Sequence, residues 1–214
     1  MENLWQFFVK GGFFMIPIGL CSIIALAVIL ERAFSLARHR IINAPLATAI
    51  LKFHHTDDPT PLEQLCARET TALCRIVKTC FMHLNWTKFE NSEAMQTRAR
   101  AEVSAMERNL VWLEIITGVA PLLGLLGTVS GLVVVFSSYL DQGMVSQGPM
   151  LAKGIAEALN TTVFGLVVAI PSMMAHGIFS RRVESYAVEL EILSTDLLGK
   201  LYTSSDDEEN FVNE

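Results

Sequence analysis

The chain has 214 residues, of which 51% are hydrophobic and 18% are charged, and its formal net charge at pH 7 is −6. A mean hydropathy of +0.41 exceeds what one soluble core requires, so the sequence predicts an integral membrane protein. The negative charge argues against nucleic-acid binding, which needs a basic surface. No nucleophile and base lie at a plausible spacing, so no enzymatic activity, cofactor or metal site is expected.

The amino-terminal residues 1–11 and the apolar segment 12–35 are expected to associate with a membrane. Aromatic rings in Leu4-Trp5-Gln6-Phe7-Phe8 suit the headgroup layer, so residues 1–11 are predicted to be an interfacial segment. Residues 12–35 exceed the ~20 residues that a bilayer crossing takes. They lack the positive start and cleavage site of a signal peptide, so a retained transmembrane helix 1 is expected, facing lipid.

Residues 36–110 show helical rather than strand periodicity and predict a cytoplasmic helical region. One break is expected at His54-His-Thr-Asp-Asp-Pro-Thr-Pro61 and a second near Asn85 to Ser92. From Ser92 the chain contains no glycine or proline until Gly118, so one helix is predicted to continue from here into the next span. The loop cysteines match no common zinc spacing and are predicted to be reduced structural thiols: Cys66, Cys74 and Cys80.

Residues 111–140 form the second predicted span. Spacings of three and four place small and hydroxylated residues on one face of this helix, namely Thr117, Pro121, Gly124, Thr128 and Gly131. Small side chains let helices approach closely, and a threonine hydroxyl forms hydrogen bonds where lipid offers no partner. This face is therefore expected to lie against protein or a narrow lumen.

A periplasmic loop at residues 141–153 is expected to lead to the third span, residues 154–180. A second seam of small or polar residues recurs here at spacings of three and four, namely Ala158, Thr162, Gly165, Ala169, Ser172 and His176. Glu157 is expected near a membrane interface at the start of the span, because a carboxylate at mid-bilayer costs at least ~2.5 kcal/mol. Residues 181–202 continue as a cytoplasmic helix, and the acidic residues 203–214 are predicted to be a disordered tail.

Lysine and arginine set the predicted orientation. With the amino terminus outside, the outer segments hold only Lys10 and Lys153, and the inner segments hold the other 14 of the 16 basic residues. The expected fold is an all-α integral membrane protein with three transmembrane helices. The second and third helices extend into a cytoplasmic helical bundle, and the carboxyl terminus is cytoplasmic.

The two seams admit two interpretations. One is plain helix packing, in which Thr128 and Thr162 bond to carbonyls of their own helices. The other is a polar pore, because each seam carries a threonine near mid-membrane and a proline, Pro121 or Pro171, that kinks the helix and frees a backbone carbonyl. One chain has too few spans to enclose a pore, so this interpretation requires a homo-oligomer around an axis.

Three titratable residues near the span ends each have two possible roles. Glu157 is either a first-turn residue favoured by the helix dipole or a lumen-facing group that loads protons. His176 is either a hydrogen-bonded interface residue or a proton exit group. Glu114, one turn before Thr117, either sits at a membrane interface or flanks the inner mouth of the pore.

Two motifs resemble the signature of the MotA/TolQ/ExbB proton-channel family, in its three-span ExbB/TolQ branch. They are Ala120-Pro-Leu-Leu-Gly-Leu-Leu-Gly-Thr-Val129 and Gly154-Ile-Ala-Glu-Ala-Leu-Asn-Thr-Thr-Val-Phe-Gly-Leu-Val-Val-Ala-Ile-Pro171. Glu31-Arg32 ends the first span before them, and the resemblance covers residues 10–200. By motif position, it implies that the pore threonines of the family fall on Thr128 and Thr162, and its characteristic glutamate on Glu157.

The resemblance also implies partners and a task. It implies a pentamer in a bacterial inner membrane, surrounding two copies of a single-span ExbD/TolR-type subunit that supplies an aspartate. This assembly would couple the proton-motive force to work on a periplasm-spanning TonB/TolA-type protein, for nutrient import across the outer membrane. A TolQ-like role in envelope maintenance and a non-conducting structural scaffold are the alternatives.

Overall fold

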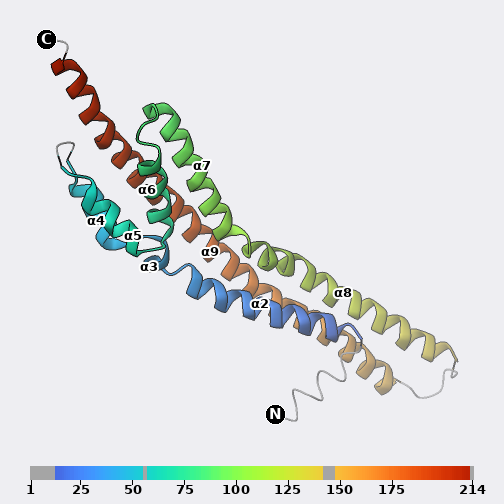
Figure 1. The fold of residues 1–214 in the computed structure, drawn as a ribbon. Helices are drawn as coiled ribbons and strands as arrows, with labels where there is room; N and C mark the ends of the chain where they lie inside the picture. Colours follow the sequence, from blue (N-terminus) through green and yellow to red (C-terminus); the bar gives the residue numbers. More distant parts are fainter. Residues whose placement is uncertain (1–12, 55–56, 142–147, 213–214) are drawn as a thin grey trace. The chain divides into compact units, whose positions relative to one another are not determined.

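The computed structural model describes residues 13–54, 57–141 and 148–212, and Figure 1 shows them as a set of helices. No strand occurs among these residues, and three helices are long and apolar enough to cross a membrane. They are α2 (Met15–Ser35), the stretch Lys88–Ser137, which contains most of α8 (Leu110–Asp141), and the part of α9 (Gly148–Val212) from Gly154 to Tyr202. The predicted all-α membrane fold with three spans is therefore confirmed.

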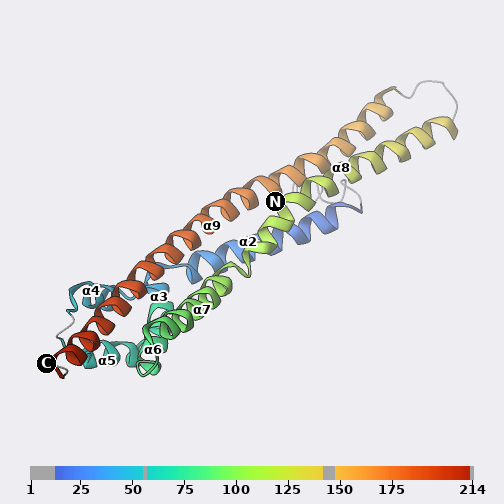
Figure 2. The ribbon, with the colours of Figure 1, turned by 90° about the horizontal axis from the view of Figure 1, so that it is seen from above.

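The chain divides into two compact units. Unit 1 comprises Met1–Arg32 and Asn109–Ile178, and unit 2 comprises Ala33–Arg108 and Phe179–Glu214. Unit 1 therefore contains most of α2, all of α8 and the first part of α9, which lies beside α8 in Figures 1 and 2. Unit 2 contains the intervening helices and the second part of α9.

Helix α2 exposes most of its apolar surface. Ile16, Leu20 and Ile23 are 64%, 55% and 67% exposed. Its buried residues are Met15, Ile18, Ala25 and Arg32, which occupy one side of the helix. Exposed aliphatic surface of this extent is unfavourable in water and natural in lipid, so α2 suits the peripheral place that the sequence predicts for the first span.

The helix predicted to run without a break from Ser92 into the second span is interrupted. Helix α7 (Lys88–Glu107) ends before a turn at Arg108 and Asn109, and α8 begins at Leu110. The Asn109 side chain donates to a Glu31 carboxylate oxygen on α2, at 3.2 Å. Asparagine is a weak helix former because its side chain competes with the backbone for hydrogen bonds. The helical stretch Lys88–Ser137 is therefore continuous, as the sequence predicts, except for this two-residue turn.

Helix α9 is longer than the sequence predicts at both ends. It starts at Gly148, inside the expected loop 141–153, and runs to Val212, through most of the tail predicted to be disordered. Extending an existing helix adds one hydrogen bond per residue without a new nucleus, which accounts for this difference. The interfacial segment 1–11, loop residues 142–147 and tail residues 213–214 lie outside the described residues.

Unit 2 consists of short helices packed on α7 and α9. They are α3 (Arg38–Ile41), α4 (Ala44–Lys52), α5 (Thr60–Arg68) and α6 (Ala72–Met82). The two predicted breaks fall between α4 and α5 and between α6 and α7. At the second break Thr87 starts α7 with a capping box: its hydroxyl accepts from the Glu90 N–H, and the Glu90 carboxylate accepts from the Thr87 N–H.

Aliphatic and thiol side chains fill the core of unit 2. Those that are at most 1% exposed include Leu46, Ile50, Leu73, Ile76, Val77, Leu190 and Leu197. Cys66, Cys74 and Cys80 are fully buried in the same core as free thiols. Burial raises the pKa of Cys80 to about 12, so its thiol stays protonated and unreactive near neutral pH. These cysteines are structural, as the sequence predicts.

Two polar clusters join the helices of unit 2. The Glu102 carboxylate accepts two hydrogen bonds from the Arg75 guanidinium, at 2.7 and 2.5 Å, and pairs with Arg98 at 2.8 Å. Hydrogen bonding to Glu102 raises the pKa of Arg75. The Asn91 amide donates to the Tyr202 hydroxyl at 3.0 Å, which links α7 to the carboxyl-terminal part of α9. These bonds hold α6, α7 and α9 in fixed register.

Candidate functional site

Helices α8 and α9 meet along their small residues. A Cβ added to Gly124 would lie 2.9 Å from the Thr161 carbonyl oxygen, and one added to Gly165 would lie 2.5 Å from the Ala120 carbonyl oxygen. Neither distance accommodates a methyl group, and both neighbours are backbone atoms that cannot turn aside. Gly124 and Gly165, one residue from each predicted seam, therefore lie in the contact between α8 and α9 within one chain.

The contacts also set the register of the helix pair. Gly131 lies opposite Ala158, whose Cβ would be 3.0 Å from an added Cβ, and Gly127 lies opposite the Thr161 side chain. Residue numbers thus rise along α8 while they fall along α9, so the helices are antiparallel. Ala120, Gly124, Gly127 and Gly131 form the contacting stripe on α8.

This stripe differs from the seam that was predicted on α8. The sequence reasoning overlooked Ala120, Gly127 and Thr161, which take part in the contact. The signal was present in the sequence, because Ala120, Gly124, Gly127 and Gly131 recur at spacings of four, three and four and are all small. The prediction counted hydroxylated residues and proline together with small residues. The predicted face therefore includes Pro121 and Thr128, each one residue after the contacting Ala120 and Gly127.

The predicted site residues divide into buried and half-buried groups. The buried ones are Gly124, Thr128, Ala158, Gly165, Ala169 and Ser172, and the half-buried ones are Thr117, Pro121, Gly131, Thr162 and His176. Pro171 is exposed, and it lies inside α9 as Pro121 lies inside α8. Glu157 belongs to α9, but its side chain lies outside the described part of the structure.

The hydroxyl groups of the seams differ in their hydrogen bonds. Thr117, Thr128 and Ser172 donate to carbonyl oxygens of their own helices, at 2.8, 2.7 and 2.8 Å. Such bonds satisfy the donor and leave the hydroxyl oxygen able to accept. For Thr162 no hydrogen-bond partner occurs among the described residues. The packing interpretation accounts for Thr128, and it leaves the Thr162 hydroxyl without a partner from the described part of this chain.

Thr128 and Thr162 lie on the same side of the helix pair. Each follows a residue of the facing pair Gly127 and Thr161. Viewed from one end, one helix of an antiparallel pair turns clockwise along its sequence and the other turns anticlockwise. The next residue after each facing residue is rotated by about 100°, so both next residues lie on the same side of the pair. An added Cβ on Gly127 would lie 3.3 Å from the Cβ of Phe14, just before α2. Helix α2 therefore lies toward the opposite side, and the two threonines share the side away from α2, where Thr162 is half-buried and Thr128 is 6% exposed.

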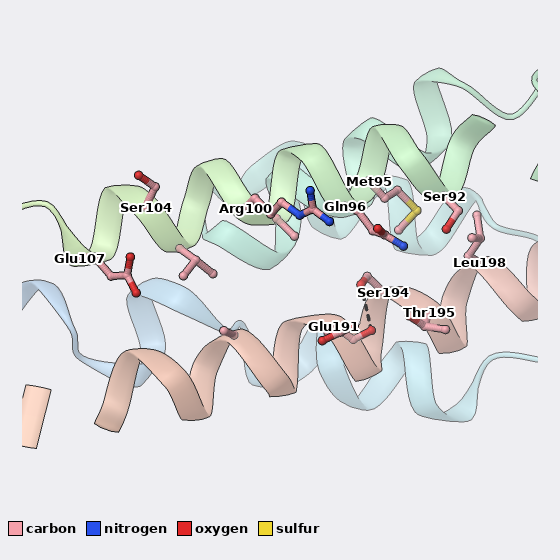
Figure 3. A pocket seen from close by; sticks show the side chains of 13 residues that line it. Ser92, Met95, Gln96, Arg100, Ser104, Glu107, Glu191, Ser194, Thr195 and Leu198 are labelled. Carbon is pink, nitrogen blue, oxygen red and sulfur yellow. Dashed lines mark hydrogen bonds between the residues drawn. The ribbon is translucent and has the colours of Figure 1, made fainter. Parts of the chain in front are cut away.

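A groove in unit 2 is separate from this face. It has a volume of about 350 Å³ and lies between α7 and α9, whose side chains converge on it in Figure 3. Its walls combine small residues such as Ala99 and Ser194 with the charged Arg100, Glu107 and Glu191. Ser194 donates to the Glu191 carbonyl oxygen at 3.0 Å. The groove contains none of the predicted site residues, so the threonine face remains the candidate site.

Comparison with known proteins identifies the family that this chain resembles. The family model of the MotA/TolQ/ExbB proton channel family matches residues 69–192, a range that contains both seams. The chain is 31% identical over 170 residues to a putative biopolymer transport protein ExbB-like 3 of Synechocystis sp., covering 79% of this chain and 81% of the relative.

Two further relatives carry different names. Biopolymer transport protein exbB1 of Vibrio cholerae is 26% identical over 194 residues, covering 89% of this chain and 85% of the relative. The Tol-Pal system protein TolQ of Haemophilus influenzae is 37% identical over 92 residues, covering 43% of this chain and 40% of the relative.

Proposed function

This chain belongs to the MotA/TolQ/ExbB proton channel family, and we propose that it is the proton-conducting subunit of an ExbB-like motor in a bacterial inner membrane. The observation that supports this proposal best is the common side of Thr128 and Thr162, which lies away from α2. Two hydroxyls on one face of paired spanning helices provide hydrogen-bonding groups for a water-filled or helix-filled lumen.

The lumen is formed by several copies of the chain. One copy presents the threonine face from only two helices, so a closed ring of copies is needed to surround it, with α8 and α9 inward and α2 facing lipid. The motif resemblance implies that this ring is a homopentamer, and the distribution of lysine and arginine predicts an amino terminus in the periplasm and a carboxyl terminus in the cytoplasm. Tight α8–α9 packing through Gly124 and Gly165 makes each copy a rigid wall element.

The proton-carrying carboxylate at mid-depth comes from a partner. In α8 the middle of the span carries no acidic residue, and in α9 Glu157 lies between Gly154 and Ala158, at the end of the α8–α9 contact where Gly154 faces Val135. A single-span ExbD/TolR-type subunit, in two copies, supplies an aspartate beside Thr128 and Thr162. One charge crossing 100 mV releases about 2.3 kcal/mol, enough to bias a conformational step. Glu157 loads protons from the outer side.

The work passes to a TonB/TolA-type periplasm-spanning protein. We propose an ExbB-like role in nutrient import, with a TolQ-like role in envelope maintenance as the alternative. Relatives of both names align with this chain, ExbB proteins over 49% to 89% of it and TolQ proteins over 43% and 54%. Loss of the gene is expected to abolish uncoupler-sensitive nutrient uptake before it weakens the envelope.

The test replaces both hydroxyls without changing side-chain shape. Thr128→Val with Thr162→Val is expected to stop proton flux in liposomes that hold the tagged chain and its co-purified partner. Ser137→Ala is the matched control, because Ser137 is an exposed α8 residue whose hydroxyl bonds its own helix at 2.9 Å. Native mass spectrometry should give the same homo-oligomer for the wild type and both variants. Wild-type flux in the double variant would leave only the scaffold alternative.

A further inference from the structure

Glu114 is a carboxylate near the start of a membrane-spanning helix. It is the fifth residue of α8 and is exposed in the single chain, beside the exposed apolar residues Val111, Trp112 and Ile115. Among the described residues it has neither an ion-pair nor a hydrogen-bond partner. Glu31, the nearby acid on α2, is instead bonded to Arg32 and to Asn109. A carboxylate near the end of a span avoids the high cost of a charge at mid-bilayer, and one without a partner in the described part of its own chain can meet water or groups from outside the chain.

Glu114 lies on the same face of α8 as Thr117 and Thr128. At about 100° per residue, Glu114 is within about 60° of Thr117 and about 40° of Thr128. Asn109, just before α8, bonds Glu31 of α2, and Gly127 lies beside Phe14, just before α2, so these two positions mark the side of α8 toward α2. Glu114 is turned about 140° away from Asn109. The carboxylate therefore belongs to the side away from α2.

The position along the axis places Glu114 at an end of this face. It is about 21 Å from Thr128, at 1.5 Å per residue, toward the Leu110 end of α8. Extending the register of the α8–α9 contacts puts it about level with residues 172–176 of α9, which include Ser172 and His176. Three other charged or titratable groups lie toward the Leu110 end of α8 in the described part of unit 1. They are His176 on α9 and, on α2, Glu31 and Arg32, which bond each other.

From this placement we infer that Glu114 is a proton-transfer site at the inner mouth of the threonine face, an inference that rests on the proposed function. The carboxylate takes a proton from hydronium in the lumen and becomes a carboxylic acid, and the hydronium becomes water as its O–H bond breaks. The carboxylic acid then returns the proton to water at the mouth, with His176 as the titratable group at the same level. The O–H bond formed in the first step breaks in the second, so no other reactant is needed.

The experiment compares Glu114→Gln and Glu114→Asp in the tagged complex with its co-purified partner. Proton flux into liposomes is followed with an entrapped pH-sensitive dye between pH 6 and 8. Glu114→Gln should lower flux about 10-fold or more and flatten its pH profile, and Glu114→Asp should restore both. Glu107→Gln is the control, because this exposed acid lies on α7 rather than on a span.

The outcomes separate this inference from the proposed function. If Glu114→Gln conducts like the wild type at every pH, the inference is overturned while the threonine pore stands. The inference is also overturned if Glu114→Gln lowers flux equally at every pH and Glu114→Asp gives no recovery, since that pattern marks a structural role. If the wild-type complex carries no flux, or the paired Thr128 and Thr162 variant conducts normally, the proposed function fails and the inference fails with it.

Discussion

The closeness of α8 and α9 leads to a sharp prediction for Gly165→Ala. The new Cβ would lie 2.5 Å from the Ala120 carbonyl oxygen and 3.3 Å from the Gly124 Cα. An ordinary contact needs at least 3.4 Å, so the helices must separate by nearly 1 Å at this point. Overpacking of this kind costs about 1–3 kcal/mol, against at most about 1 kcal/mol gained by replacing glycine with alanine in a helix. We expect a net loss of stability and a misplaced Thr128–Thr162 face.

The control for this change lies on the same helix. An added Cβ on Gly177 meets nothing within 4 Å, so Gly177→Ala should be neutral or stabilising by up to about 1 kcal/mol. Unfolding of both variants in detergent, followed by circular dichroism against increasing denaturant, measures the difference. Proton flux in liposomes reports the position of the threonines. Equal stability and flux for the two variants would refute the close α8–α9 contact.

Two predictions concern unit 2. Tyr202→Phe removes the hydroxyl that donates to the Trp86 carbonyl oxygen at 2.9 Å and accepts from the Asn91 amide. The change should lower the free energy of unfolding by about 1–2 kcal/mol in chemical denaturation. An unchanged unfolding midpoint would contradict this role. Hydrogen bonds from Thr87 lower the pKa of the Glu90 carboxyl from its ordinary value of 4.5. The ionised carboxylate therefore stabilises the start of α7 above pH 4.5, and this stabilisation is lost as the pH falls through the lowered pKa. Thr87→Ala should abolish this acid-dependent part of the stability, and a pH dependence identical to that of the wild type would count against the capping box.

The elements of the fold could be predicted from the sequence because their causes are local. Three apolar stretches of sufficient length specify the spans, and the prolines of residues 54–61 separate α4 from α5. The local sequence predicts the ends of the helices less well than it predicts the helices themselves. Nothing adjacent in the sequence indicates that the Asn109 side chain bonds Glu31, 78 residues away, at the turn between α7 and α8.

The candidate site could be predicted in part. Spacing alone indicates which residues of α8 and α9 are small or hydroxylated, and therefore that Gly124 and Gly165 avoid lipid. It does not indicate what they face, since packing within the chain and lining a pore require the same small side chains. The motif resemblance pointed to Thr128 and Thr162 without stating their geometry.

The amino-acid pattern thus specifies the class of protein, its three spans and the residues able to line a polar face. Which side of each helix remains available depends on how the helices pack. The register set by Gly127 and Thr161 turns Thr128 and Thr162 to one side, and Phe14 brings α2 against the other. The reason is physical: helical periodicity is a property of one segment, whereas the free side of a helix depends on which other segments have already covered the rest.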